Sequence, residues 1–309
     1  MKNRLWWVWL LSWAAAVAAA SAATAARSFT VATYNLENYL LEPSGTRSAK
    51  SLAAREQVVR ELLAIRPDVL AVQEIGPPPA LVELQQRLRT AGLELPHLEH
   101  VRGWDTNIFV AVLSRFPFSA RRSHSNDSFL LEGRRFQMGR GIVEVDLAVT
   151  PQTRFTLLAA HLKSKLPSAR VDESTLREAE ALVLRGHVEA AFRRDPKASL
   201  VVCGDLNDHK GSRPMRLLLA KGRSSLVDPR PGERSVDSPD TPRSGSNARR
   251  IVWTHFYAQE DTYARFDYLL LSPAMKTRWR PSGSYVHSSV NWGLASDHRP
   301  VVCEFTITE

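Results

Sequence analysis

An aspartate and a histidine stand side by side near the end of this sequence, directly before an apolar run. Asp297 and His298 precede Pro300, Val301 and Val302, where a strand is predicted to begin. The carboxylate can bind a divalent metal, and the imidazole can donate a proton or a hydrogen bond to a phosphoryl oxygen. Such a pair is also common in solvated turns. Its chemistry therefore depends on which other polar groups reach it.

Four further polar side chains each follow the end of a predicted strand. These positions are held by Asn35, Glu74, His161 and Asp205. Strand ends lie together in α/β proteins, and Asn207 follows Asp205 at the spacing that points two side chains of an extended backbone to the same side. Taken singly, an asparagine of a turn commonly bonds its own backbone, and a glutamate or histidine there can be solvated. Together the five residues predict one site.

A buried aspartate and several lysines extend this group. Asp267 adjoins an apolar strand, where a carboxylate needs a partner, and His298 is the natural candidate. Lys163, Lys165 and Lys210 add positive charge near the site, although solvated loop charge explains them equally well. Carboxylates, amides and two histidines without a serine or cysteine nucleophile motif favour phosphoester hydrolysis by water. Oxygen ligands favour the hard cations Mg²⁺ or Mn²⁺ as cofactor.

These side chains require strands that end at a common edge and helices that cover them. The hydrophobic patterns predict helices at 51–65, 80–90 and 173–192. They predict strands at 29–34, 69–73, 107–113, 141–149, 155–160, 200–203, 251–257, 266–271 and 301–305. Residues 121–140 are predicted to be an irregular surface excursion, and 228–250, rich in Pro, Ser, Arg, Asp and Gly, a mobile loop. The order favours two mixed sheets packed face to face with helices outside.

The first 26 residues differ from the rest and predict export to the periplasm or the outside of the cell. Lys2 and Arg4 precede an uncharged stretch that ends in small residues, as in a signal peptide, although an uncleaved anchor would look similar. Residues 27–309 then form one domain. Without Lys2 and Arg4 the net charge of +9 becomes +7, from 39 basic and 32 acidic residues. A basic surface suits a polyanion or an anionic membrane.

The sequence contains two cysteines, Cys203 and Cys303. An exported protein with two cysteines can form one disulfide. Both residues lie in apolar, strand-like runs, where small buried thiols are equally common. Neither has the spacing of a zinc site. The pattern therefore leaves the choice between a disulfide and two thiols open.

Six short motifs, in order along the chain, carry a family resemblance. They are TYNLE at 33–37, VQE at 72–74, AHLK at 160–163, GDLN at 204–207, FDY at 266–268 and SDHRP at 296–300. With them the chain resembles the endonuclease/exonuclease/phosphatase superfamily, which includes deoxyribonuclease I and neutral sphingomyelinases. The resemblance covers residues 29–305. It implies an α/β fold of four layers, in which two packed mixed β-sheets are flanked by helices and the site lies at one edge.

The resemblance also implies roles for the residues of these motifs. The metal-site residues would be Asn35, Asp297 and, as the main ligand, Glu74. Asp205 would position and activate water, and Asn207 would orient the phosphate or that water. Arg140 is the candidate for the family's phosphate-contacting arginine. Lys163, Lys165 and Lys210 would add to phosphate binding.

The two histidines would act on the phosphate. His298, paired with Asp267, would contact the scissile phosphate, and His161 would stabilise the transition state or protonate the leaving oxygen. In deoxyribonuclease I-like members an acid supports the first histidine. It has no clear counterpart in this sequence, and Asp105 and Asn107 are the candidates.

We therefore expect an exported phosphodiesterase that uses Mg²⁺ or Mn²⁺ and acts on DNA or RNA, with no stable protein partner. The HLKSK wording at 161–165 is similar to that of secreted bacterial nucleases of the superfamily. The rivals are a phospholipase C-type sphingomyelinase or phosphoinositide phosphatase, a small-molecule phosphatase and a non-catalytic binding protein on the same fold. A lipid substrate or an uncleaved anchor would imply membrane contact. Trp253, Phe256 and Tyr257 keep the lipid rival open.

Overall fold

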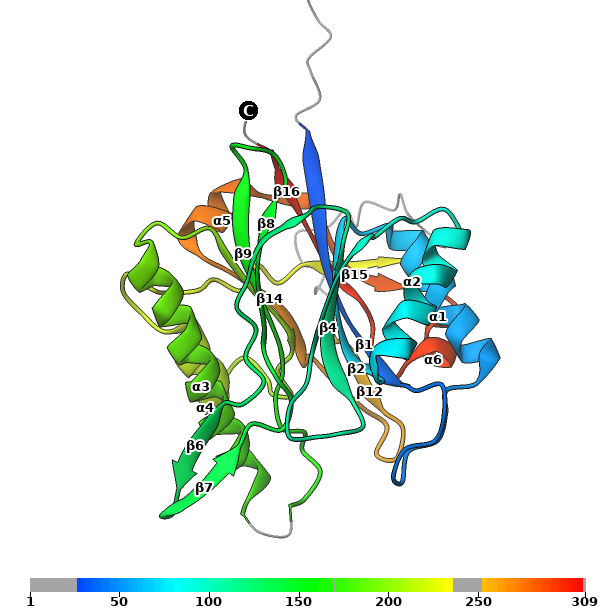
Figure 1. Cartoon of the computed structure of the whole chain (residues 1–309), viewed down its shortest axis with the longest axis horizontal. Coiled ribbons are helices and arrows are strands. Elements are labelled where there is room, and N and C mark those ends of the chain that lie inside the picture. Colours follow the sequence, from blue (N-terminus) through cyan, green and yellow to red (C-terminus); the bar gives the residue numbers. More distant parts are fainter. Residues whose placement is uncertain (1–26, 169–170, 236–251, 308–309) are drawn as a thin grey trace, which may run out of the picture.

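Two mixed β-sheets form the centre of the structure, a computed structural model that describes residues 27–168, 171–235 and 252–307 (Figure 1). In these ranges the larger sheet has seven strands, in the spatial order β11 (Gly232–Ser235), β15 (Trp279–Ser288), β16 (Val301–Thr306), β1 (Ser28–Tyr39), β2 (Val69–Ile75), β4 (Phe109–Ser114) and β3 (His97–Val101). The smaller sheet has five, in the order β14 (Asp267–Leu271), β10 (Leu200–Asp205), β9 (Arg154–His161), β8 (Val143–Ala148) and β5 (Phe118–Arg121).

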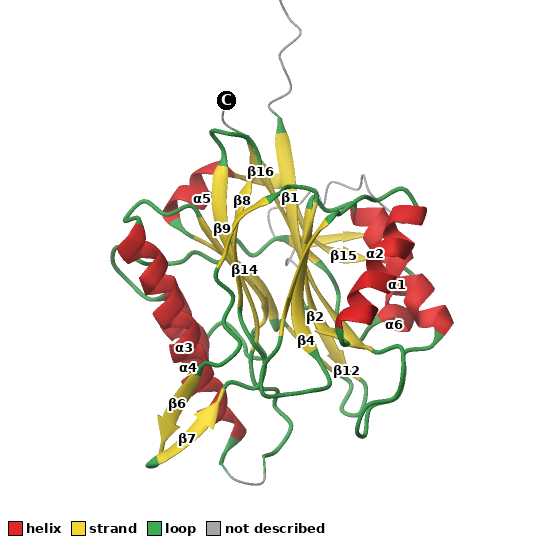
Figure 2. Ribbon diagram, in the orientation of Figure 1, coloured by secondary structure: helices red, strands yellow, loops and turns green. Residues whose placement is uncertain are grey.

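Alternation of side chains along the strands gives each sheet two apolar faces. Val31 and Val201 point into the core between the sheets, whereas their neighbours Ala32 and Val202 point outward to the helices. Figure 2 shows helices on both outer faces. The larger sheet is covered by α1 (Leu52–Ile65), α2 (Pro78–Thr90) and the short α6 (Trp292–Ala295), and the smaller sheet by α3 (Glu173–Arg194) and α4 (Arg213–Leu219). The predicted four-layer sandwich is confirmed.

The remaining elements are short. Helix α5 (Pro273–Arg278) packs beside β10, β14 and β16, and Met275 fills the end of the core between the sheets. Two hairpins stand outside the two large sheets: β6 (Ser128–Leu131) with β7 (Arg134–Gln137), and β12 (His255–Tyr257) with β13 (Thr262–Ala264).

The segment 121–140 contains the β6–β7 hairpin, so the prediction of an irregular excursion was wrong. Glu132 and Gly133 connect the two strands, and their φ angles of 50° and 74° are those of a two-residue hairpin turn. The hairpin lies beside one end of α3 (Figure 1). Its strands are mostly half-buried or exposed, so they lack the alternating apolar stripe that predicts a strand. The glycine of the turn was the available signal.

The regions around the predicted loop at 228–250 also differ from expectation. Residues 232–235 form β11, which pairs in parallel with β15, while 236–250 lie outside the described residues. The strand predicted at 251–257 is confined to β12. The hydroxyl of the buried Thr254 accepts hydrogen bonds from the backbone N–H groups of Phe266 and Asp267. These side-chain bonds, and not the backbone bonds of a β-ladder, hold Thr254 against the start of β14.

Both cysteines are buried free thiols in the core between the two sheets. Cys203 lies in β10 and Cys303 in β16. Burial raises the pKa of both thiols, so neither is a ready nucleophile. The predicted signal peptide at 1–26 lies outside the described residues. Within the ranges given above, no helix is long and apolar enough to cross a membrane.

Gly204 is required where β10 passes β9 on the way to the site. Its φ is +132°, and a Cβ atom there would lie 1.8 Å from the carbonyl oxygen of Ala160. We expect Gly204→Ala to lower the free energy of unfolding by about 3 kcal/mol or more, because backbone strain and a backbone clash add. Gly186 in α3 is the matched control, since a Cβ there meets nothing within 4 Å. Denaturant unfolding of both variants measures the difference, and equal stabilities would contradict it.

Candidate active site

The predicted site residues gather at one edge of the sandwich, where two parallel strand pairs end. Asn35 lies in β1 and Glu74 in the adjacent β2, while His161 and Asp205 are paired at the ends of β9 and β10. Asp267 begins β14 and pairs with Asp205 from the other side. The structure thus brings together the carboxylates and imidazoles that the strand-end pattern predicted.

Asp205 is the centre of this cluster. Its Oδ2 accepts a hydrogen bond from Asn35 Nδ2 at 2.9 Å and lies 3.5 Å from His161 Nε2. Its Oδ1 accepts the backbone N–H of Asn207 at 2.9 Å. Burial raises the pKa of this carboxyl to about 7, although the charge of His298 opposes the rise. A carboxyl of this pKa can take a proton from water near neutral pH.

His298 is held by a second buried carboxylate. Its Nδ1 lies 2.8 Å from Asp267 Oδ2, and its Nε2 faces Asp205 Oδ2 at 3.7 Å. Burial lowers the pKa of His298, but the charges of Asp267 and Asp205 outweigh burial and raise this pKa well above its ordinary value. The imidazole is therefore a cation at neutral pH. A cation at this position can stabilise the negative charge on a phosphoryl oxygen.

His161 has the opposite electrostatic character. Burial lowers its pKa well below the ordinary value, and the nearby charges of Arg140 and His298 lower it further. At neutral pH the ring is uncharged, so it donates a hydrogen bond instead of carrying a charge. Its Nδ1 has no hydrogen-bond partner among the described residues. No acid supports this nitrogen among the described residues, as expected from the missing counterpart in the sequence.

The two candidates for that acid serve another residue. Asp105 Oδ1 accepts the backbone N–H of Asn107 at 2.8 Å, and its Oδ2 lies 3.8 Å from Arg140 Nε. Neither Asp105 nor Asn107 bonds to His161, so both candidates were wrong. Asp105 instead holds Arg140 in place.

Arg140 is the basic residue that the structure brings to the site. It is buried, and its Nε lacks a hydrogen-bond partner among the described residues. Of the predicted lysines, Lys163 Nζ donates to the carbonyls of Ser164 and Leu166. The other two are Lys165, which lies 3.5 Å from Asp208, and the exposed Lys210. The ammonium group of Lys163 is thus engaged in its own loop, and that of Lys165 pairs with the loop after β10.

Glu74 adopts a strained backbone that turns its side chain into the site. Its φ is +59°, in the left-handed region, and the ladder of β2 shifts register here. A bulge beside a functional site re-aims a side chain. Glu74 Oε1 lies 3.4 Å from Asn35 Nδ2 and 4.0 Å from His161 Nε2, and Oε2 accepts the backbone N–H of Asn38 at 3.0 Å.

Asp297 is the most exposed member of the site, with 40% of its side chain accessible. Its Oδ2 lies 3.6 Å from His255 Nε2 and its Oδ1 lies 3.9 Å from His298 Nε2. Burial raises the pKa of Asp297, but the contact with His255 and the charge of His298 outweigh burial and lower it. The carboxylate is therefore ionised. His255 belongs to the site and was missed by sequence reasoning.

The donor set fits a hard divalent cation. Glu74 and Asp297 supply carboxylates, and oxygen donors of this kind suit such ions. The side-chain carbonyl of Asn35 accepts the backbone N–H of Glu37 at 3.0 Å, while its amide nitrogen faces Asp205 and Glu74. Asp205 has a buried oxygen in contact with the same asparagine. When bound, the cation would polarise the phosphoryl group and offset the charge of the leaving oxygen. The protein's own residues hold the carboxylates and orient the imidazoles.

Asn207 acts on the backbone next to His161. Its side-chain amide donates to the carbonyl of Leu162 at 3.0 Å, and its φ is +54°. A buried glutamate, Glu180 in α3, accepts the backbone N–H groups of Gly139 and Lys163. Glu180 thus joins the segment before Arg140 to the segment after His161. No periodicity or motif singles out this helix residue.

Comparison with known proteins identifies the family of this chain. The sequence matches the model of the Endonuclease/Exonuclease/phosphatase family over residues 32–298, and the chain belongs to this family. It is therefore a metal-dependent phosphoric ester hydrolase. A sequence search finds no matching curated protein.

Three solved structures show the same fold. The catalytic domain of human nocturnin, with a bound sulfate anion, is 18% identical with a TM-score of 0.60, and the match covers 91% of this chain and 95% of that one. An AP endonuclease from Archaeoglobus fulgidus is 15% identical with a TM-score of 0.60, over 90% and 100%. Sphingomyelinase C from Streptomyces griseocarneus is 19% identical with a TM-score of 0.56, over 91% and 100%.

Without metal, the free energy of unfolding of the protein should fall as the pH rises through the titration of this site. The raised pKa values of Asp205 and His298 mean that both groups hold protons more tightly in the folded protein. Their contribution is thus present at low pH and lost as the pH rises, for Asp205 through about 7. In the presence of chelator, the free energy of unfolding of Asp205→Asn minus that of the parent should therefore increase by about 2–4 kcal/mol from pH 4 to pH 8. Unfolding measured across this range tests it, and a pH-independent difference would refute it.

Proposed function

We propose that this chain is an exported nuclease that hydrolyses DNA or RNA with Mg²⁺ or Mn²⁺. The observation that carries the proposal is Arg140, which is buried near His161, lies 3.8 Å from Asp105 and has no hydrogen-bond partner for its Nε among the described residues. A guanidinium held at a cluster of carboxylates recognises a phosphate group. Arg47 Nη1 adds positive charge 4.0 Å from Glu74. The positive net charge of the chain favours a substrate with many phosphate groups, such as a nucleic acid.

The proposed reaction uses the protonation states described above. The carboxylate of Asp205 takes a proton from the attacking water. The cationic His298 and the neutral His161 donate hydrogen bonds to phosphoryl oxygens, and Arg140 binds a non-bridging oxygen. Water attacks phosphorus and one P–O bond breaks. No covalent enzyme intermediate is needed.

Aromatic side chains near Asp297 can stack with the unpaired bases of a nucleic acid. Trp253 lies 5.1 Å from Trp292 and 4.9 Å from Tyr263 between ring centroids, and Phe256 donates its backbone N–H to the carbonyl of Asp297. Bases of a single strand stack on such rings. Tyr263 is 58% exposed. This cluster is the specific support for contact with nucleobases.

The same cluster favours a second candidate, a phospholipase C-type hydrolase of sphingomyelin or a phosphoinositide. Val290 and Leu294, next to Trp292, are 79% and 49% exposed, and exposed apolar side chains near a site can dock on a membrane. This candidate includes membrane contact, whereas the nuclease does not. Neither requires a stable protein partner.

Product analysis separates the two candidates. The mature protein is incubated in parallel with plasmid DNA, RNA and sphingomyelin vesicles, each with Mg²⁺, with Mn²⁺ and with chelator. The nuclease proposal expects cleavage of DNA or RNA, lost in chelator, with little release of phosphocholine. The Asp205→Ala variant controls for contaminating nucleases. Hydrolysis of sphingomyelin without cleavage of either nucleic acid would overturn the proposal in favour of the second candidate.

Export is proposed from the sequence of residues 1–26 alone. Expression of the full chain in a bacterium, followed by fractionation and N-terminal sequencing, tests it. We expect the mature N-terminus close to residue 27 in the periplasm or medium. A full-length protein retained in the membrane would identify an uncleaved anchor.

A further inference from the structure

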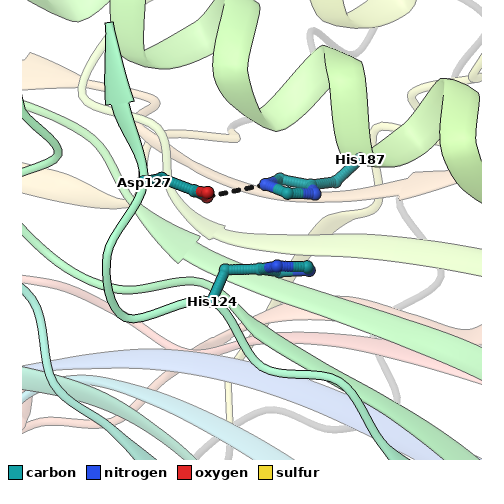
Figure 3. A group of neighbouring side chains, drawn as sticks. All are labelled: His124, Asp127 and His187. Carbon is teal, nitrogen blue, oxygen red and sulfur yellow. Dashed lines mark hydrogen bonds and ion pairs between the residues drawn. The ribbon is translucent and has the colours of Figure 1, made fainter.

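Two histidines and an aspartate form a second cluster that the proposed reaction does not use. His124 and Asp127 lie in the connection between β5 and β6, and His187 lies on α3 (Figure 3). One ring nitrogen of each histidine and one carboxylate oxygen all lie within 4.8 Å of one another. The three side chains are 23%, 25% and 19% exposed, so small solutes reach them.

The cluster is tightly assembled. His187 Nε2 lies 2.6 Å from Asp127 Oδ2. The rings of His124 and His187 stack with centroids 3.6 Å apart at 23°, and Figure 3 shows the carboxylate directed at the upper of the two rings. In both rings the carboxylate contact is at Nε2: Asp127 contacts this atom in His187, and Glu144 contacts it in His124. Nδ1 of each ring is the nitrogen left for a metal.

A buried carboxylate supports His124 from behind. Glu144, whose side chain is fully buried, lies 2.9 Å from His124 Nε2 and also binds Arg122 and Arg194. A carboxylate bound by two arginines is a hydrogen-bond acceptor, so it holds the proton on Nε2 of His124 and leaves the lone pair on Nδ1. Histidine ligands of metals commonly have such a carboxylate behind them.

We propose that His124, Asp127 and His187 bind a divalent transition metal of the zinc class, at a site separate from the carboxylates of the active site. Two nitrogen ligands and one oxygen ligand suit Zn²⁺, with water completing the coordination. Because nearly parallel rings direct their lone pairs side by side, one imidazole must rotate before both bind the same ion. The proposal does not depend on the proposed function.

The position of the site suggests a structural role for the ion. His124 pairs through its backbone with Ile142, and the carbonyl of Asp127 accepts the N–H of Met138. A metal shared with His187 would therefore fasten the segment around the β6–β7 hairpin to α3. Binding to the folded protein alone raises its stability by mass action.

Zinc titration of the full mature protein, freed of metal, tests the proposal. We expect His187→Ala to bind one equivalent of Zn²⁺ fewer than the parent and to lose the rise in Tm that Zn²⁺ gives the parent. His97→Ala, a histidine of β3 outside the cluster, is the matched control and should behave as the parent. Asp297→Asn reduces binding at the active site instead, so its loss and that of His187→Ala should add.

A second variant and a spectroscopic readout keep the test decisive. Asp127→Asn changes one atom of a half-buried loop residue and should weaken Zn²⁺ binding at this site at least tenfold. Co²⁺ bound to the parent should show the absorption of a site with nitrogen ligands, and His187→Ala should lose it. If both variants bind as many equivalents of Zn²⁺ as the parent, with the same Tm shift, the proposed site does not exist.

Discussion

Replacing Asp205 by asparagine is expected to lower kcat by about 10²–10⁴-fold, which is the range for loss of a general base. Asparagine keeps the shape of the side chain and can still bond to Asn35 and to the backbone of Asn207, but it cannot accept the proton of water. The variant should be at least as stable as the parent, so the loss is one of chemistry. Initial rates at saturating metal measure it.

Asp195→Asn is the matched control for this change. Asp195 is exposed at the end of α3, and its carboxylate only caps the backbone of Lys197. It should retain the full rate. If Asp205→Asn kept more than a tenth of the parent kcat with an unchanged Tm, Asp205 would not be the base.

Replacing His298 by alanine is expected to lower kcat/KM by about 10²–10⁴-fold. The change removes a cation that Asp267 holds at 2.8 Å and that faces Asp205 at 3.7 Å. It also leaves the buried Asp267 without its partner, so some loss of stability should accompany the loss of activity. His97→Ala controls for removal of an imidazole elsewhere.

Asp267→Asn tests whether Asp267 sets the charge of His298 or only its position. Since Asp267 raises the pKa of His298, its removal lowers that pKa, and the rate should begin to fall at a lower pH on the alkaline side. We expect a smaller loss at neutral pH than for His298→Ala. A pH–rate profile identical in shape to that of the parent would mean that the pair does not set the charge of His298.

The strand ends could be predicted because parallel strands place their ends together. Asn35 and Glu74 lie toward the ends of one parallel pair, and His161 and Asp205 at the ends of another, so four distant residues meet without any knowledge of loops. The partner of His298 was predictable as well, because a carboxylate at the start of the buried strand β14 requires one.

The rest of the site depends on tertiary packing that no local pattern encodes. His255 contacts Asp297 because the backbone of His255 forms a β-bridge with His298. Arg140 is held near His161 by the ion pair with Asp105 and by the hydrogen bond from the backbone of Gly139 to Glu180. Short elements such as β3, β5 and α6 are too brief for periodicity to identify. The contacts of the lysines depend on tertiary packing as well, since Lys163 binds carbonyls of its own loop and Lys165 pairs with Asp208.

We propose that this cluster, with a divalent cation, hydrolyses nucleic acid. Cleavage of plasmid DNA and of RNA by the parent and by Asp205→Asn, after metal removal and after return of Mg²⁺ or Mn²⁺, tests this proposal. We expect the parent to cut at least one substrate only when the cation is returned, and the variant to show no more than about a hundredth of this rate. Cleavage that survives chelator, or that the variant shares, would contradict it.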